Sequence, residues 1–347
     1  MSIETYVRAM PKVELHVHLE GAIQPSTVLE LAQRNHIDLP FHDEITLRKS
    51  FTYRDFDHFI ETFIMVTHSL KTVEDYELIV YELGAEMARQ NVRYAEVTVT
   101  PSTHHRFGIP HDTWFSGLQK GRSRVQVDFG ITINWIFNIV RKWADATVTE
   151  PMADYVTRVA IEGKNDGVVA LGLAGSEAGA PAERFARWFE QAHAEGLHSV
   201  PHAGEMAGPE SIWGAIHGLG AERIAHGVRA IEDPRLVEYL VEQRLPLDIT
   251  PTSNVQLGVY PGYAAHPLPQ LYSAGAIVTV STDDPPLFNT TLSDEFALLA
   301  TVFGLDVDAI DQIALNGVRS SFLPEMYRRD LETACRREFA RLKTIHG

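Results

Sequence analysis

The stretch Val13-Glu-Leu-His-Val-His18 is a short apolar run that ends on a pair of histidines. Seven further runs follow along the chain, and most are rich in valine, isoleucine and leucine without strict polar alternation. The eight runs cover residues 13–18, 92–100, 127–135, 167–173, 198–202, 223–226, 245–250 and 276–282. Such runs are typical of parallel strands that helices cover on both faces.

Segments with helical periodicity separate these runs. Residues 209–219 place apolar side chains on one face, begin with a proline and are followed by a glycine. The same reasoning predicts helices over residues 73–90, 182–194 and 234–243. Eight strands that alternate with helices predict an α/β fold of the (β/α)8 type, a TIM barrel. A doubly wound sheet is the alternative, but neither a G-x-G-x-x-G motif nor a P-loop follows any of the runs.

The chain has 347 residues, which is more than the roughly 250 of a typical barrel. We expect the surplus in extra C-terminal helices and in a helical insertion after the first strand, over about residues 40–75, at the mouth of the barrel. This aromatic-rich insertion either forms a lid or only packs against the barrel. No repeat, low-complexity tract or linker divides the sequence, so residues 1–347 are expected to form a single barrel domain.

Composition narrows the range of partners. The formal net charge of −16 disfavours binding to nucleic acids and to anionic membrane surfaces. No stretch approaches the roughly 20 apolar residues of a membrane span, and the first residues lack the features of a signal peptide. The single cysteine, Cys335, excludes an intrachain disulfide and a cysteine-rich metal site. We therefore expect a cytoplasmic protein.

Ionisable side chains follow four of the predicted strands, at the ends where barrel enzymes carry their active sites. These residues are His16 and His18 in the first strand, His202 and Glu205 at the fifth, His226 at the sixth, and Asp283 and Asp284 at the eighth. Alternate residues of a strand share a face, so His16 and His18 can bind one ion. Asp283 and Asp284 adjoin in an extended segment, so we expect one carboxylate to face the metal and the other the substrate.

Three imidazoles and one carboxylate suit Zn²⁺ with an open position for water, although Co²⁺, Fe²⁺ or Mn²⁺ could substitute. The fourth strand ends without a lysine that could support a second metal, which favours a single ion. A zinc ion lowers the pKa of its bound water toward about 7. Glu205 lies three residues after His202 and is suited to carry protons, and His226 can orient the water or accept its proton.

The motifs around these residues resemble those of the adenosine/adenine deaminase family of zinc-dependent, amidohydrolase-like barrels. The matching stretches, in family order, are Pro11-Lys-Val-Glu-Leu-His-Val-His-Leu-Glu-Gly21, Leu173-Ala-Gly-Ser-Glu177, His202-Ala-Gly-Glu205, His226-Gly, Thr250-Pro-Thr-Ser-Asn-Val-Gln256 and Ser281-Thr-Asp-Asp-Pro285. The resemblance extends over most of the chain, and the motifs are specific when taken jointly.

The resemblance implies a role for each site residue. The implied zinc ligands are His16, His18, His202 and Asp283. Glu205 would donate a proton to purine N1, and His226 would stabilise and help to deprotonate the attacking water. Asp284 would form a hydrogen bond with purine N7, and the backbone N–H of Gly175 would meet N3. Water would then add at C6 of the purine, and ammonia would leave.

Two departures from the family pattern bear on the substrate. Glu20 stands where adenosine deaminases usually carry an aspartate that contacts the ribose 5′-hydroxyl. A glutamate at this position resembles the pattern of the adenine deaminase branch of the family. Ser176 also replaces a usual aspartate, whereas residues 251–256 and 289–292 resemble bacterial adenosine deaminases. We predict that His18 and Glu20 contact a 6-aminopurine nucleoside, adenosine or deoxyadenosine. Adenine or a 5′-modified nucleoside such as aminodeoxyfutalosine is the alternative.

Two other classes of function stay open at this point. A zinc hydrolase of a cyclic amide or ester would not need the N1 proton that Glu205 supplies. A catalytically silent purine-binding protein would need none of the residues that activate water, and the presence of Glu205, His226 and Asp284 argues against it. The sequence predicts no oligomeric state.

Overall fold

The computed structural model describes residues 3–143 and 145–346. It contains eight parallel strands: β1 Lys12–His18, β2 Val92–Val99, β3 Thr132–Val140, β4 Val168–Ala174, β5 His198–Ala203, β6 Ile224–His226, β7 Leu247–Ile249 and β8 Val278–Val280. Each strand pairs with the next in chain order, from β1 to β8. Backbone hydrogen bonds between β1 and Asp283, just after β8, nearly close the sheet into a barrel. The TIM-barrel prediction is confirmed.

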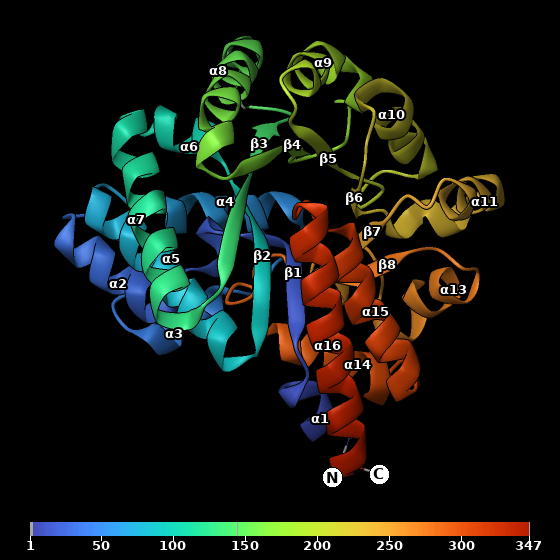
Figure 1. The fold of residues 1–347 in the computed structure, drawn as a ribbon. Helices are drawn as coiled ribbons and strands as arrows, with labels where there is room; N and C mark the ends of the chain where they lie inside the picture. Colours follow the sequence, from blue (N-terminus) through green and yellow to red (C-terminus); the bar gives the residue numbers. More distant parts are fainter. Residues whose placement is uncertain (1–2, 144, 347) are drawn as a thin grey trace.

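Helices surround the strands (Figure 1). Their bounds are α1 Ile3–Ala9, α2 Pro25–Arg34, α3 Glu44–Ser50, α4 Phe56–Thr67, α5 Val73–Arg89, α6 Pro101–Arg106, α7 His111–Phe129, α8 Thr149–Glu162, α9 Ala186–Ala194, α10 Pro209–Leu219, α11 Pro234–Glu242, α12 Pro251–Gln256, α13 Leu268–Ser273, α14 Leu292–Thr301, α15 Val307–Ser320 and α16 Glu325–His346. The predicted helices that begin at Val73, Pro209 and Pro234 are therefore confirmed, and the predicted helix over 182–194 begins with a 3-10 turn, Ala182–Phe185. Within the described residues, no helix is long and apolar enough to cross a membrane.

The predicted third strand, over residues 127–135, overlaps β3 at residues 132–135, but its predicted start was wrong. The helix α7 continues to Phe129, and Val127 lies on its exposed side with 83% of its surface accessible. Gly130, with a left-handed φ of 69°, ends that helix, and β3 begins only at Thr132. A valine on the outer face of a helix and the first valine of a strand look alike in the sequence, so the apolar pattern alone cannot separate them.

The helical insertion after β1 packs over the mouth of the barrel. The aromatic rings of Phe59 and Phe288 stack with centroids 5.2 Å apart, and the ring of Phe63 lies 6.2 Å from that of His18. The hydroxyl of Tyr53 donates a hydrogen bond to the carbonyl of Leu287 at 3.0 Å. These contacts place α4 against the segment after β8, and the helical insertion and the C-terminal helices α14 to α16 agree with the predicted fold. The single-domain assignment for residues 1–347 stays a prediction, and residues 1, 2, 144 and 347 lie outside the described residues.

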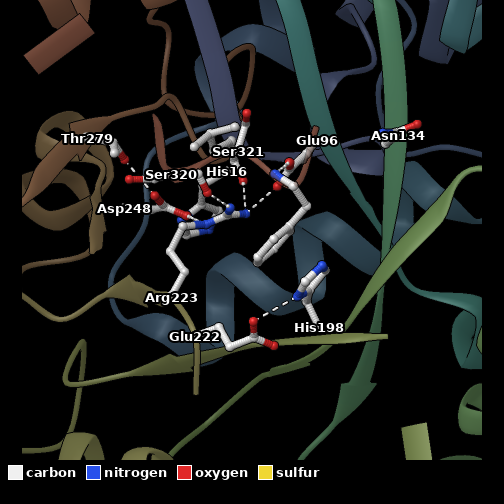
Figure 2. Close-up of polar contacts among 12 residues, drawn as sticks. His16, Glu96, Asn134, His198, Glu222, Arg223, Asp248, Thr279, Ser320 and Ser321 are labelled. Atoms are coloured by element: carbon white, nitrogen blue, oxygen red, sulfur yellow. Dashed lines mark hydrogen bonds and ion pairs between the residues drawn. The ribbon is translucent and has the colours of Figure 1, made fainter. Parts of the chain in front are cut away.

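A buried ionic cluster fills the interior of the barrel on the amino-terminal side of β6 (Figure 2). The guanidinium of Arg223 donates to Asp248 Oδ2 at 2.5 Å and to Glu96 Oε2 at 2.6 Å, and all three side chains are inaccessible. Burial lowers the pKa of Arg223, but the charges of Asp248 and Glu96 outweigh it and hold this pKa above its ordinary value. The ring of Phe322, which follows α15, lies 4.6 Å from the Arg223 guanidinium. The C-terminal region thus helps to seal this end of the barrel.

Candidate active site

Three histidines and one aspartate converge at the carboxyl ends of the strands. The Nε2 atom of His202, in β5, lies 3.1 Å from Nε2 of His16 and 3.2 Å from Nε2 of His18, both in β1. The Oδ1 atom of Asp283 lies 3.4 Å from Nε2 of His16 and 3.3 Å from Nε2 of His18. All four side chains are buried. The structure therefore brings the four predicted metal ligands together.

The spacing of these atoms fits a metal ion. Ligand atoms that surround a zinc ion tetrahedrally at about 2.1 Å lie about 3.4 Å from one another. A cation between the Nε2 atoms of the three histidines and Oδ1 of Asp283 would be bound by all four of these atoms. A group with His226 in place of His18 also has its ligand atoms within 4.8 Å of one another.

A chain of hydrogen bonds sets the tautomer of His226. The backbone N–H of Leu268 donates to Nδ1 of His266, so the proton of that ring lies on Nε2, which donates to Oδ1 of Asn254 at 3.1 Å. The amide nitrogen of Asn254 and the hydroxyl of Thr250 then face Nδ1 of His226, at 3.4 and 3.1 Å. Burial lowers the pKa of His226 to about 3. The neutral ring therefore carries its proton on Nε2, which lies 3.6 Å from Glu205 Oε2 and 4.0 Å from Asp283 Oδ2.

The segment after β8 departs from the extended conformation expected for Asp283 and Asp284. Asp283 has a left-handed φ of 68°, an uncommon backbone conformation for a residue other than glycine. The ligand atoms of His18, Asp283 and Asp284 lie within 4.8 Å of one another, so both carboxyl groups lie beside His18, and the assignment of one to the metal and the other to the substrate stays a prediction. The hydroxyl of Ser253 donates to Asp283 Oδ2 at 2.6 Å, which leaves Oδ1 toward the histidines.

The three acidic groups of the site differ in their electrostatic surroundings. Burial raises the pKa of Asp283, but the charges of His16 and His226 and a hydrogen bond from His16 outweigh it and hold this pKa well below the ordinary value. Burial, and then the charge of Asp283, raise the pKa of Glu205 and of Asp284 well above their ordinary values. Asp283 is therefore suited to bind a cation, whereas Glu205 and Asp284 are suited to carry a proton at neutral pH.

The loop that carries Glu205 is held by one carboxylate from the neighbouring strand end. Glu177, which follows β4, accepts hydrogen bonds from the backbone N–H groups of Gly204, Glu205, Met206 and Ala207 at 2.6 to 3.1 Å. The hydroxyl of Ser211 donates a fifth hydrogen bond to Glu177 Oε1 at 2.5 Å. Because consecutive N–H groups converge on one buried acceptor, the Glu205 backbone has little freedom to move.

The remaining predicted residues, Glu20 and Gly175, lie just after the ends of β1 and β4. Glu20 lies in the turn Glu20–Ala22 directly after β1 and is inaccessible. Gly21 lies so close to the Asp284 carboxyl group that an added Cβ would fall 1.6 Å from Asp284 Oδ1, so only glycine fits here. Gly175 follows β4 with a left-handed φ of 89°, which favours glycine at this turn. No contact links Glu20 or Gly175 directly to the four converging ligand atoms.

Sequence reasoning assigned no role to Glu177, Ser253 or Asn254. All three residues lie within the family motifs quoted above, and this was the one feature of the sequence that could have pointed to them. Their partners are backbone groups or side chains in other segments of the chain, at least 12 positions away, and such contacts cannot be read from spacing along the chain.

A barrel with a histidine and carboxylate cluster at its carboxyl end is the architecture of amidohydrolase-type enzymes. A family model described as adenosine deaminase matches residues 11–336, so this chain belongs to the adenosine deaminase family. The predicted family and the prediction of an enzyme that acts on carbon–nitrogen bonds are confirmed. Deamination of an aminopurine-type substrate is the activity that these findings support.

Three known proteins illustrate the relationship. The aminodeoxyfutalosine deaminase of Streptomyces coelicolor is 39% identical over 321 residues, which cover 92% of this chain and 82% of that protein. A crystal structure of adenine deaminase from Arthrobacter aurescens has a TM-score of 0.89 and 30% identity, covering 97% of this chain and 100% of that one. An amidohydrolase from Burkholderia ambifaria, solved with bound Zn, has a TM-score of 0.88 and 26% identity, covering 99% and 94%.

Proposed function

We propose that this enzyme removes the 6-amino group of a 5′-modified adenosine of the aminodeoxyfutalosine type by hydrolysis. The observation that supports deamination most strongly is the convergence of His16, His18, His202 and Asp283 beside the buried Glu205 carboxyl group. The similarity to an aminodeoxyfutalosine deaminase at 39% identity supports the choice among purines. The comparisons thus favour the alternative of the sequence analysis over adenosine, its first choice.

The proposed cofactor is one Zn²⁺ per chain, held by the three histidines and Asp283. When bound, the ion supplies a water molecule that ionises near neutral pH. The spacing of the ligand atoms and the zinc in the Burkholderia ambifaria structure support this choice of metal. Ser253 contributes by holding the second oxygen of Asp283.

Glu205 and His226 carry the proposed acid–base chemistry. Burial and the charge of Asp283 raise the pKa of Glu205, which favours the protonated carboxyl group, and this group can give its proton to purine N1, which makes C6 electrophilic. The Nε2–H group of His226 points toward Glu205 and Asp283 and can donate a hydrogen bond to the attacking water, which orients the water toward C6. This tautomer favours the orienting role of His226 over the role of a base. The proton that the attacking water gives up returns to the Glu205 carboxylate, and addition of the oxygen at C6 gives a tetrahedral intermediate. The hydroxyl proton of this intermediate passes to the amino group, which leaves as ammonia.

We place the proposed substrate contacts at the carboxyl ends of the strands, beside the metal cluster. A raised pKa lets Asp284 donate a hydrogen bond to purine N7, which is an acceptor. The backbone N–H of Gly175 would meet N3, and His18 and Glu20 would contact the substrate. No nucleic acid or membrane is part of this proposal, and the partner is a small molecule.

Adenine is the second candidate substrate. The glutamate at position 20 resembles the pattern of the adenine deaminase branch of the family. The adenine deaminase from Arthrobacter aurescens also shares the fold over nearly the whole chain, and both similarities favour adenine as the alternative substrate.

Ammonia release from aminodeoxyfutalosine, adenine, adenosine and deoxyadenosine tests the proposal directly. We expect the highest kcat/KM for aminodeoxyfutalosine. A higher kcat/KM for adenine would show that adenine, the second candidate, is the substrate. Ammonia release from none of the four compounds would contradict aminopurine deamination. The Glu205→Gln variant is the matched control, because it should abolish release from whichever compound the wild type uses.

A further inference from the structure

Glu20 is held by a side chain that the proposed reaction does not use. Its Oε1 atom accepts a hydrogen bond from the backbone N–H of Thr100 at 2.8 Å and another from Nε2 of His104 at 2.9 Å. His104 lies in the short helix α6 that follows β2, and it is 1% exposed. The pair thus joins the end of β1 to the end of β2 beneath the surface of the barrel mouth.

Tyr76 supports the far side of the His104 ring. The Tyr76 hydroxyl lies 2.9 Å from Nδ1 of His104, and Tyr76 is inaccessible. Burial raises the pKa of this hydroxyl far above its ordinary value, so the hydroxyl keeps its proton and can donate it to Nδ1. The Nε2 atom on the other side of the ring donates to Glu20, so the Tyr76–His104–Glu20 relay is a continuous chain of hydrogen bonds.

The second oxygen of Glu20 has no such partner. Oε2 is buried and accepts no hydrogen bond from any described residue. A buried carboxyl oxygen without a hydrogen-bond partner is costly in free energy, and a donor supplied by a bound ligand removes that cost.

The free oxygen belongs to the substrate side of the site. Gly21, the residue after Glu20, lies against the Asp284 carboxyl group, since a Cβ added to Gly21 would fall 1.6 Å from Asp284 Oδ1. This Oδ1 atom is a second buried oxygen without a partner among the described residues. The turn that carries Glu20 therefore lies beside Asp284, and a ligand bound there meets the unpartnered Oε2 of Glu20.

We propose that His104 is a positioning residue for substrate specificity, which holds Glu20 so that Oε2 accepts a hydrogen bond from an N–H or O–H group of the substrate other than the departing amino group. In a 6-aminopurine these donors are the N9–H group of a free base or the hydroxyls of an N9-linked sugar. A purine with a methyl group on N9 has neither. This inference rests on the proposed aminopurine deamination and adds the determinant that selects donor-bearing substrates.

The test compares one donor-bearing substrate with one donor-free analogue. The substrate is whichever of aminodeoxyfutalosine, adenine and adenosine the wild type deaminates best, and the analogue is 9-methyladenine, whose affinity is measured as a competitive inhibition constant. For His104→Leu we expect KM for the substrate to rise at least about tenfold, the loss of one charge-assisted hydrogen bond, while the inhibition constant of 9-methyladenine stays within about twofold. In His104→Gln the side-chain amide can still donate to Glu20, so KM should return to within about threefold of wild type.

Further variants and controls separate the possible failures. Tyr76→Phe should raise KM less than His104→Leu does, because the Nε2 donor is retained. His105→Leu changes the adjacent, exposed histidine and should alter neither constant. Equal losses for substrate and analogue, or no rescue by glutamine, would show a merely structural role and overturn the inference while aminopurine deamination stands. A wild type that deaminates none of the three substrates would overturn the proposed function and this inference together.

Discussion

Replacing Glu177 by glutamine should misplace the acid–base residue Glu205 while the metal-binding residues beside it stay in position. In the wild type, two carboxylate oxygens accept five hydrogen bonds, four of them from the consecutive N–H groups of residues 204–207. Glutamine turns one oxygen into an N–H donor that faces other donors, so at least two of these bonds are lost. Hydrogen bonds to a charged acceptor each contribute about 1.5–3 kcal/mol, which gives a local loss of about 3–6 kcal/mol.

Without these hydrogen bonds the loop over residues 204–207 should shift, and the Glu205 side chain should move out of its position. A displacement of about 1 Å in a catalytic group can lower turnover about 100-fold, so we expect kcat of Glu177→Gln to fall at least tenfold. Metal content should stay near the wild-type value, because His202 lies within β5 and upstream of the loop. The assay combines ammonia release, metal analysis and urea unfolding, in which we expect a decrease of about 3 kcal/mol.

Two variants serve as controls for Glu177→Gln. Glu210→Gln makes the same chemical change in an exposed glutamate that accepts only the N–H of Gly208 from this loop, and it should leave turnover within about twofold. Ser211→Ala removes one of the five donors and should cost about 1.5–3 kcal/mol with little loss of turnover. Unchanged turnover and stability in Glu177→Gln would refute the reasoning that this carboxylate positions Glu205.

Two further predictions concern the acid–base residue and the barrel interior. The Glu205→Gln variant should keep its metal but lose at least about 100-fold in turnover, the scale expected for a positioned proton donor. Metal analysis and steady-state kinetics would check both parts, and activity near the wild-type level would contradict the assigned role. The Arg223→Met substitution leaves Glu96 and Asp248 buried without their cation. It should lower the free energy of unfolding, measured by urea denaturation, by about 3–5 kcal/mol. An unchanged urea midpoint would show that the ionic cluster contributes little to stability.

The barrel and the metal cluster could be predicted because both depend on local patterns. Apolar runs at regular intervals mark the strands, and the alternation of side chains along β1 puts His16 and His18 on one face. The carboxyl ends of all strands meet at one mouth, so residues at the ends of distant runs come together without any knowledge of their detailed contacts. The error at residues 127–135 arose where an apolar residue lies on the outside of a helix.

The conformation of Asp283 and the supports of the site could not be predicted in this way. A left-handed φ at an aspartate runs against local preference and is stabilised by hydrogen bonds with His16 and His18 on the first strand. Glu177 and His104 matter through partners that lie 27 or more positions away along the chain. Such pairs follow from the closed geometry of the barrel, which composition and spacing do not encode.

The metal dependence of activity tests the central claim most directly. The protein should be purified without added metal, its metal content measured per chain, and ammonia release assayed before and after dialysis against a chelator and after addition of Zn²⁺, with His16→Ala in parallel. We predict about one divalent ion per chain, loss of activity on chelation, recovery with zinc, and little bound metal in His16→Ala. Full activity in protein that binds no divalent ion would contradict the account.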